Sequence, residues 1–447
     1  MSTAETFIFS DFHYDPATRR LRLGYGFDDG SQFVEEIRFE GARTSLSPEE
    51  TDALTALFRQ LHLAAGISYY KAWCPAKIEV NTGPLSRAEA DFFSKFYLMG
   101  LGEFAVENDL DLRERINFPV SADVAPKAAQ LKLPNMNAVP VGGGKDSIVS
   151  IEALRHAGKP QRLLAVNPGR PILEVMERSG IPDPIIMRRK LDPRLFELNE
   201  RGALNGHVPI TGILSFVMAA GSVLYGYDHI VMSNEQSANE GNMVWNGLEI
   251  NHQYSKSLEF ERDFTAYLQA HVLEGLTYFS LLRPLSETGI ACLFARAPQY
   301  FDVFKSCNRN FHIDEGVRRY GWCCDCPKCR FVYLALAPFV GKEKLVAIFG
   351  HDMLDDPAQE PGFRELCGLE GHKPFECVGE IAECRLIMKS LALQPDWQHS
   401  RLVGTLAAEI SEPGLTPKAL EQEALKMSPN HQLPPAYKEL LDDFAGA

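Results

Sequence analysis

The strongest constraint on the fold is a strand, a glycine loop and a helix in direct succession. An apolar run at 138–141 predicts a buried strand, and three consecutive glycines follow it at 142–144. Glycines let the backbone turn tightly because no Cβ atom is in the way. Apolar residues then recur at helical spacing from 148 to 154, and Gly158 stands where a left-handed C-terminal cap is expected. The sequence therefore predicts a β–loop–α unit around which an α/β domain is built.

This loop has the features of a phosphate-binding site. It presents backbone N–H groups, a helix N-terminus, the Lys145 ammonium group and the Ser147 hydroxyl to one small volume. The sequence contains neither Gly-x-x-x-x-Gly-Lys-Ser/Thr nor Gly-x-Gly-x-x-Gly, so the loop is not of either common nucleotide-binding type. A glycine-rich turn without a ligand is the alternative, but Lys-Asp-Ser directly after three glycines favours a nucleotide.

The segment Gly142-Gly-Gly-Lys-Asp-Ser147 resembles the Ser-Gly-Gly-x-Asp-Ser loop of the PP-loop ATP pyrophosphatases. Those enzymes cleave ATP to AMP and pyrophosphate while they adenylate a substrate. The resemblance implies phosphate contacts from Gly143, Gly144 and Ser147, and a magnesium ion at Asp146. Gly142 replaces the first serine of the family loop and removes one hydroxyl contact. The implied ATP-binding residues are Gly142, Gly143, Gly144, Lys145, Asp146 and Ser147.

Composition narrows the class of protein. The chain has 447 residues, enough for two or three domains, and its 45% hydrophobic and 23% charged content is ordinary for a globular enzyme. A net charge of −14 argues against nucleic acid as a partner but allows a small anionic ligand in a local basic pocket. The apolar run at 210–225 is interrupted by small and polar residues, and the N-terminus lacks the regions of a signal peptide. We therefore expect a cytoplasmic protein without a membrane partner; the oligomeric state stays open.

Three regions are predicted. Residues 1–120 form an N-terminal α+β module, with a hairpin turning at 28–31 and two helices that begin with capping boxes. Residues 121–340 alternate strands and helices as a doubly wound PP-loop domain should, and residues 341–447 form a mainly helical C-terminal region.

Two polar segments of the central region are predicted to face the glycine loop. The strand at 229–232 ends in Ser233-Asn-Glu-Gln-Ser-Ala-Asn-Glu-Gly-Asn242, and ligands of open α/β sheets bind at the carboxyl ends of strands. Residues 243–256 mix aromatic and basic side chains without periodicity, as ligand-recognition loops often do. A solvated surface loop is the alternative in both cases. The candidate substrate-binding residues are Asn234, Asn242, Tyr254 and Lys256.

Four cysteines have the spacing of a metal site. Cys323, Cys326 and Cys329 follow an x₂, x₂ pattern that brings three thiolates around one tetrahedral ion, and Cys307 supplies a fourth. The pattern also resembles the zinc site of the 7-cyano-7-deazaguanine synthases, another PP-loop family. An iron–sulfur cluster is the alternative metal centre, since thiolates alone serve both. Cys324 is left over, either as an inert neighbour or as a reactive thiol.

The chain as a whole resembles the UDP-N-acetylmuramoyl-L-alanyl-L-glutamate epimerases of peptidoglycan synthesis. The resemblance rests on the N-terminal module, 142–147, Ser233-Asn-Glu-Gln-Ser237 with Glu240-Gly-Asn242, Asn251-His-Gln-Tyr-Ser-Lys256, the cysteine cluster and His372-Lys-Pro-Phe-Glu-Cys377. It implies an ATP- and magnesium-dependent isomerase of cell-wall biogenesis, and hence of cell shape and division, with a UDP-MurNAc-dipeptide as its small-molecule substrate.

The implied chemistry is coherent. A carboxylate disfavours loss of the adjacent Cα proton, because the product would carry a second negative charge. Conversion to an acyl-adenylate removes the carboxylate charge and gives an enolate that nearby cations stabilise. ATP would adenylate the α-carboxylate of the terminal L-Glu, a base and its partner acid would invert Cα, and hydrolysis would release AMP and the D-Glu product. The candidate proton carriers are Glu235, His252, Cys324 and Cys377.

Two other functions remain open at this point. The first is a PP-loop synthetase that modifies a nucleobase or forms an amide or nitrile, like the deazaguanine nitrile synthases. The second is an ATP-binding regulator without turnover, although Lys145, Asp146 and the polar segment after the strand at 229–232 count against it.

Overall fold

The computed structural model describes residues 4–241, 243–311, 316, 318, 320–371, 376 and 378–447. Within these residues one nine-stranded sheet has the strand order β13-β9-β6-β7-β8-β3-β2-β1-β4. Its strands are β1 (Thr6–Asp15), β2 (Arg20–Phe27), β3 (Gln32–Phe39), β4 (Lys77–Val80), β6 (Asn137–Pro140), β7 (Gln161–Val166), β8 (Ile185–Lys190), β9 (His229–Met232) and β13 (Thr277–Ser280). Two short pairs lie outside it: β5 (Ala129–Gln130) with β12 (Leu273–Glu274), and β10 (Met243–Trp245) with β11 (Leu248–Ile250).

The sheet has a parallel half and a mainly antiparallel half. β13, β9, β6, β7 and β8 pair in parallel, as the predicted βαβ alternation requires. β3 then joins β8 antiparallel, β2 and β1 continue the antiparallel ladder, and β4 closes the edge in parallel with β1. The predicted hairpin turn at 28–31 links β2 and β3. The sheet therefore runs straight across the boundary predicted at residue 120, and the N-terminal module contributes its strands to it.

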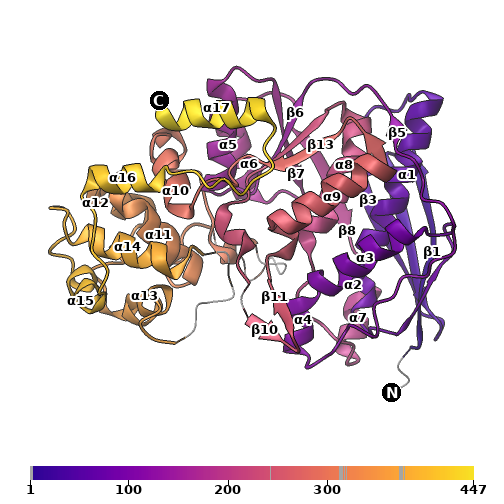
Figure 1. The fold of residues 1–447 in the computed structure, drawn as a ribbon, viewed down its shortest axis with the longest axis horizontal. Helices are drawn as coiled ribbons and strands as arrows, with labels where there is room; N and C mark the ends of the chain where they lie inside the picture. The colour runs from indigo at the N-terminus through magenta and orange to yellow at the C-terminus, as the bar shows by residue number, and fades with distance from the viewer. Residues whose placement is uncertain are drawn as a thin grey trace.

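Helices cover both faces of the parallel half. Neighbouring residues of a strand enter two different cores: Tyr278 packs on one side of β13 and Phe279 on the other. The first core lies under α1 (Pro48–Ala65), α3 (Arg87–Gly100), α8 (Ile210–Tyr225) and α9 (Leu258–His271). The second lies under α5 (Lys145–His156), α6 (Arg170–Ser179), α10 (Glu287–Ala295) and α11 (Pro327–Val340). This is a doubly wound α/β arrangement (Figure 1).

Local sequence signals explain where most of these helices begin. Ser47 with Glu50, and Ser86 with Glu89, form the two predicted capping boxes at α1 and α3. Gly158 follows α5 with φ +61°, as the predicted left-handed cap requires.

The hairpin of β10 and β11 was not predicted, because each of its strands is only three residues long. The other α-helices described before residue 341 are α2 (Ile67–Tyr70), α4 (Gly102–Glu107) and α7 (Arg194–Glu200).

The described part of the C-terminal region is mainly helical. It contains α12 (Lys342–Phe349), α13 (Glu360–Leu366), α14 (Ile381–Leu391), α15 (Arg401–Glu409), α16 (Pro417–Ala424) and α17 (Pro435–Gly446). These helices pack at the end of the molecule opposite the N-terminal strands, except that α17 returns to lie beside α5 (Figure 1). The Tyr437 hydroxyl of α17 donates to Asn137 Oδ1 at 2.5 Å, which anchors the chain end to β6.

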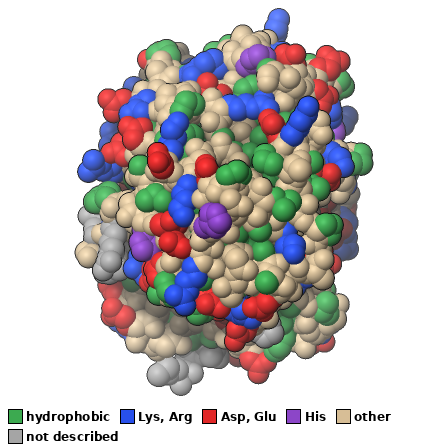
Figure 2. Space-filling model, turned by 90° about the vertical axis from the view of Figure 1, so that its left-hand side faces the viewer, with side chains coloured by type: hydrophobic (Ala, Val, Ile, Leu, Met, Phe, Trp, Pro, Cys, Tyr) green, Lys and Arg blue, Asp and Glu red, His purple; other side chains and the backbone are tan. Residues whose placement is uncertain are grey.

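The surface over the C-terminal helices carries both signs of charge. Figure 2 shows lysine and arginine side chains interspersed with aspartate and glutamate on this face. Such a mixed surface lacks the single-sign field that attracts a polyanion. Among the helices of the described residues, none combines the length and the apolar character needed to span a lipid bilayer.

Candidate functional site

The main candidate site lies where the strand order reverses. β7 and β8 follow β6 on one side, whereas β9 and β13 lie on the other, so the crevice between the carboxyl ends of β6 and β9 is a topological switch point. A cavity of about 660 Å³ opens there. It is lined by Pro140, Val141, Gly142, Gly144, Asp146, Ser147, Leu164, Ala165, Val166, Ile172, Ile210, Thr211, Leu214, Met218, Met232, Ser233, Asn234, Glu235, Lys256, Glu287, Lys305, Ser306, Asn308 and Lys328.

The glycine loop has the geometry of an anion cradle. Gly144 is the N-cap of α5 and provides no side-chain cap for the first N–H groups of the helix. Gly143 has φ +84°, a conformation that side chains disfavour. A Cβ atom on Gly144 would lie 2.6 Å from Ser306 Oγ, and the Lys305 N–H donates to Gly143 O at 2.8 Å. The segment at 305–306 therefore packs against the glycine loop and fixes its backbone.

Lys145 differs from its expected position. Its side chain is 3% exposed and is not among the residues that line the cavity. Its Nζ donates to Asp146 Oδ1 at 2.5 Å and to Glu287 Oε2. Burial alone would lower the Lys145 pKa, but the charges of Asp146 and Glu287 outweigh it and raise the pKa. The lysine thus sits beneath the loop and orients two carboxylates that do reach the cavity.

The polar segment after β9 faces the same cavity, as predicted from strand direction. Asn234 and Glu235 both line it and are 9% and 7% exposed. The Ser233 hydroxyl lies 2.7 Å from the Ser150 hydroxyl of α5, so the two loops are joined side to side. Asn242 lies outside the described residues.

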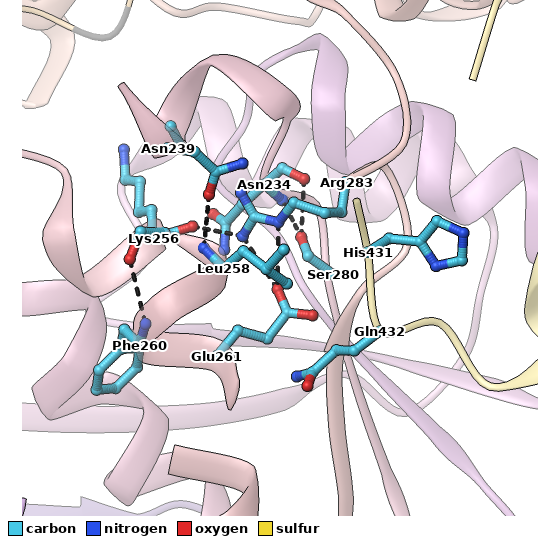
Figure 3. Close-up of polar contacts among 12 residues, drawn as sticks. Asn234, Asn239, Lys256, Leu258, Phe260, Glu261, Ser280, Arg283, His431 and Gln432 are labelled. Carbon is cyan, nitrogen blue, oxygen red and sulfur yellow. Dashed lines mark hydrogen bonds and ion pairs between the residues drawn. The ribbon is translucent and has the colours of Figure 1, made fainter. Parts of the chain in front are cut away.

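Arg283 holds this segment in place and was not predicted. Its side chain is fully buried and forms an ion pair with Glu261 Oε2 at 3.0 Å. The same guanidinium donates to Glu235 O at 2.7 Å and to Lys256 O at 2.5 Å. Figure 3 shows the guanidinium between Glu261 and the backbone near Asn234 and Lys256. One buried cation therefore fixes both polar segments that were predicted to recognise a ligand.

The cavity is chemically divided. One part of its wall is apolar and comes from the ends of β6 and β7 and from α8, including Leu164, Val166 and Met218. The other part carries three cations, which are Lys256, Lys305 and Lys328. Burial lowers the pKa of Lys305. A ligand with a planar apolar group and an anionic tail fits such a wall.

The predicted proton carriers are not all brought together. Glu235 lies in the cavity, close enough to Glu287 for its charge to help raise the pKa of that carboxyl, although burial is the larger cause. Cys324 Sγ donates to Phe349 O at 3.4 Å and does not line the cavity, and burial raises its thiol pKa to about 11. Cys377 lies outside the described residues.

Two predicted residues of the loop at 251–256 do not line this cavity. The Tyr254 ring is 4% exposed and packs edge-on against Phe260 with ring centroids 5.8 Å apart. Burial raises the Tyr254 pKa, and the residue lines a separate cavity of about 340 Å³ with Asn251 and Arg262. Burial lowers the His207 pKa to about 4, and the charge of His252 is the second cause of this shift. The two imidazoles therefore lie near each other.

Glu376 is a further acidic residue that sequence reasoning missed. Burial raises its carboxyl pKa, and the opposing influences are the Lys328 charge, a hydrogen bond from Asn308 and the His252 charge. Its Oε2 is buried and has no hydrogen-bond partner among the described residues. Lys328 and Asn308 line the cavity, so Glu376 brings the C-terminal region to its edge. Only its position in a segment rich in polar residues could have indicated this.

The predicted cysteine quartet is assembled. The Sγ atoms of Cys307, Cys323, Cys326 and Cys329 all lie within 4.8 Å of one another. Cys307 is flanked by Ser306 and Asn308, which line the cavity, and Lys328 stands between Cys326 and Cys329. The cluster therefore adjoins the cation-bearing part of the cavity.

Comparisons with known proteins agree along the chain. A model of the MurL N-terminal domain matches residues 1–281, which include all nine strands of the sheet, and a model of the MurL C-terminal domain matches residues 303–421. The UDP-N-acetyl-alpha-D-muramoyl-L-alanyl-L-glutamate epimerase of Xanthomonas oryzae pv. oryzae is 43% identical over 435 residues, covering 97% of this chain and 96% of that protein. The proteins of the same name from Micromonospora sp. and Salinispora tropica are 42% and 43% identical over 443 and 415 residues. These matches cover 98% and 91% of this chain, and 98% and 89% of those proteins.

Proposed function

The chain belongs to the MurL epimerase family, and on this basis we propose that it converts the terminal L-Glu of UDP-MurNAc-L-Ala-L-Glu to D-Glu in an ATP-dependent reaction. The observation that supports ATP as the co-substrate is the cavity at the carboxyl ends of β6 and β9. It combines an uncapped helix N-terminus, an apolar wall and three lysines in one volume.

The apolar wall suits the adenine base, and the glycine loop with Ser147 suits the phosphates. Asp146 would hold Mg²⁺, whose chemistry is to neutralise phosphate charge; its carboxylate lines the cavity and is oriented by Lys145. Glu235 also lines the cavity, and its carboxylate favours a phosphate group that arrives with a cation. Lys256, Lys305 and Lys328 would stabilise the negative charge of the triphosphate and of the enolate.

The proposed reaction begins with attack of the α-carboxylate oxygen on the α-phosphorus of ATP, which releases pyrophosphate and leaves an acyl-adenylate. A base then removes the Cα proton, the electron pair moves into the carbonyl, and an acid returns a proton to the opposite face. Water finally attacks the acyl carbon and AMP leaves, which restores the carboxylate on D-Glu.

We assign the two proton transfers to Glu376 and His252. They come from different parts of the chain, the C-terminal region and the loop after β11. The charges of Lys328 and His252 and a hydrogen bond from Asn308 all act on the Glu376 pKa, and Lys328 and Asn308 line the cavity. Inversion requires a base on one face of Cα and an acid on the other, and these two side chains would provide them. Glu235, which faces Glu287, is better placed for the phosphate and Mg²⁺.

The test is incubation of the protein with UDP-MurNAc-L-Ala-L-Glu, ATP and Mg²⁺ in D₂O, followed by mass and chiral analysis of the glutamate. We expect deuterium at Cα, D-Glu, and equal amounts of AMP and pyrophosphate. AMP without deuterium would refute epimerisation, and epimerisation without AMP would refute adenylation. Glu376→Gln and His252→Gln should still form AMP but lose D-Glu; a variant that loses both is not a specific proton carrier.

A further inference from the structure

The four-cysteine cluster has the dimensions of a site for a single metal ion. Cys307 Sγ and Cys326 Sγ are 4.0 Å apart, and Cys323 Sγ and Cys329 Sγ are 3.7 Å apart. A tetrahedral Zn²⁺ with Zn–S bonds of about 2.3 Å places its sulfurs about 3.8 Å apart. An iron–sulfur cluster puts several irons between the thiolates and separates some of them further than the 4.8 Å limit met by all four sulfurs here. The spacing favours a single ion over a cluster, the two metal centres that the sequence left open.

The surrounding backbone also suits bound thiolates. The Asp325 N–H points to Cys323 Sγ and the Cys329 N–H to Cys326 Sγ, each at 3.4 Å. Cys326 is the N-cap of α11, where the helix dipole favours a negative sulfur. Cys324, inside the first Cys-x₂-Cys step, has φ +53°, the left-handed turn that lets the chain fold back around one point. Its own thiol is directed away, to Phe349 O.

The cluster also joins two chain segments that build the cavity. Cys307 belongs to the segment whose Ser306 packs against Gly144 and whose Lys305 N–H donates to Gly143 O. Cys326 and Cys329 belong to the first turn of α11, which places Lys328 in the cavity wall. An ion at the cluster would tie these segments together and so fix the glycine loop from behind.

We propose that Cys307, Cys323, Cys326 and Cys329 bind one structural Zn²⁺ per chain, and that this ion holds the 305–308 segment and Lys328 in the geometry that binds the nucleotide. The metal part of the proposal is independent of the reaction. The nucleotide part rests on the proposed function, because it assumes that ATP is the ligand of the cavity.

The first test needs no substrate. Elemental analysis of the protein purified under reducing conditions should find one zinc per chain, and Co²⁺ substitution should give the visible bands of a tetrahedral site together with thiolate charge transfer. Cys323→Ser should lose most of the metal. Cys324→Ser is the matched control one residue away and should retain it. Iron in place of zinc, no metal, or equal loss in both variants would overturn the proposal.

The second test separates the metal from the function. Chelation of the intact protein should weaken ATP binding, measured by calorimetry, by about tenfold or more, within the usual range of coupling between two sites, and added Zn²⁺ should restore it. Circular dichroism recorded in parallel should show that the sheet remains folded. If metal loss leaves the ATP affinity unchanged, the positioning role is wrong although the zinc site stands. If the zinc-loaded protein binds no ATP, the proposed function fails and the metal result does not.

Discussion

Replacing Arg283 with methionine should separate stability from function at the site. The guanidinium is fully buried and serves Glu261, the Glu235 carbonyl and the Lys256 carbonyl at once. Its removal leaves a buried carboxylate without its partner, which typically costs about 3–5 kcal/mol of unfolding free energy. Because burial already raises the pKa of Glu261, protonation of this carboxyl limits the loss and places it near the lower end of that range.

The second variant of the cycle combines Arg283→Met with Glu261→Gln. This double variant also removes the unpaired charge of Glu261, so its free energy of unfolding in urea should be higher than that of Arg283→Met. The interaction free energy between the two positions should be about 0.5–3 kcal/mol. The carbonyls of Glu235 and Lys256 remain without their donor in this variant. Displacement of catalytic groups by about 1 Å can cost about 100-fold in rate, so epimerisation should stay low although the protein is stable again.

The measurements are urea unfolding followed by circular dichroism and the rate of deuterium incorporation at Cα. A double variant that regains both stability and rate would show that Arg283 acts only through the stability of the fold. A single variant that loses less than about 1 kcal/mol would refute the burial argument itself.

Three further predictions concern the glycine loop, acid stability and the metal requirement. Gly143→Ala and Gly144→Ala should weaken ATP binding measured by calorimetry. The first variant forces a side chain to φ +84°, and the second places a Cβ atom 2.6 Å from Ser306 Oγ. The control is Gly142→Ala, whose Cβ meets nothing within 4 Å and which should therefore unfold at the wild-type temperature. Burial lowers the pKa of His62 to about 4, whereas the imidazole of the unfolded chain has a pKa near 6.5. The free energy of unfolding should therefore fall by about 3 kcal/mol as the pH drops from 6.5 to 4. In His62→Gln, the curve of unfolding free energy against pH should be flatter in this range. Asp146→Asn should raise the Mg²⁺ concentration that half-saturates ATP turnover, and an unchanged Mg²⁺ titration would contradict its assignment.

Local signals predicted much of the fold because they act within a few residues. The capping boxes at Ser47 and Ser86 satisfy the first N–H groups of their own helices, and the glycines at 142–144 act on their own backbone angles. The direction of β9 was enough to predict that the segment after it faces the glycine loop. The cysteine spacing likewise predicted the quartet, because two Cys-x₂-Cys steps can be read along the chain.

The rest depends on contacts between distant residues. Lys145 is paired with Glu287, which is 142 positions away. The residues next to Lys145 in the sequence therefore do not indicate that its ammonium group is paired with a carboxylate. Lys328 lies in the first turn of α11 between two clustered cysteines, and it lines a cavity built mostly from residues far away in the sequence. Arg283 and Glu261 look like ordinary surface charges in a sequence and become a buried pair only when α9 packs on the sheet. A motif therefore predicts the chemistry of its own residues but not the partners that the fold brings to them.

The proposed binding of ATP by an acidic protein would draw on the charges of the cavity, and the same charges predict a requirement for Mg²⁺. Its wall carries three cations and three acidic side chains, which are Lys256, Lys305, Lys328, Asp146, Glu235 and Glu287. The cations alone cannot balance a triphosphate, because the carboxylates of Asp146 and Glu235 lie in the same low-dielectric volume and repel it. A divalent ion between Asp146 and the phosphates turns that repulsion into attraction. We therefore expect ATP without Mg²⁺ to bind more weakly than AMP, which brings fewer charges to the same carboxylates, and the order of the two affinities should reverse when Mg²⁺ is added.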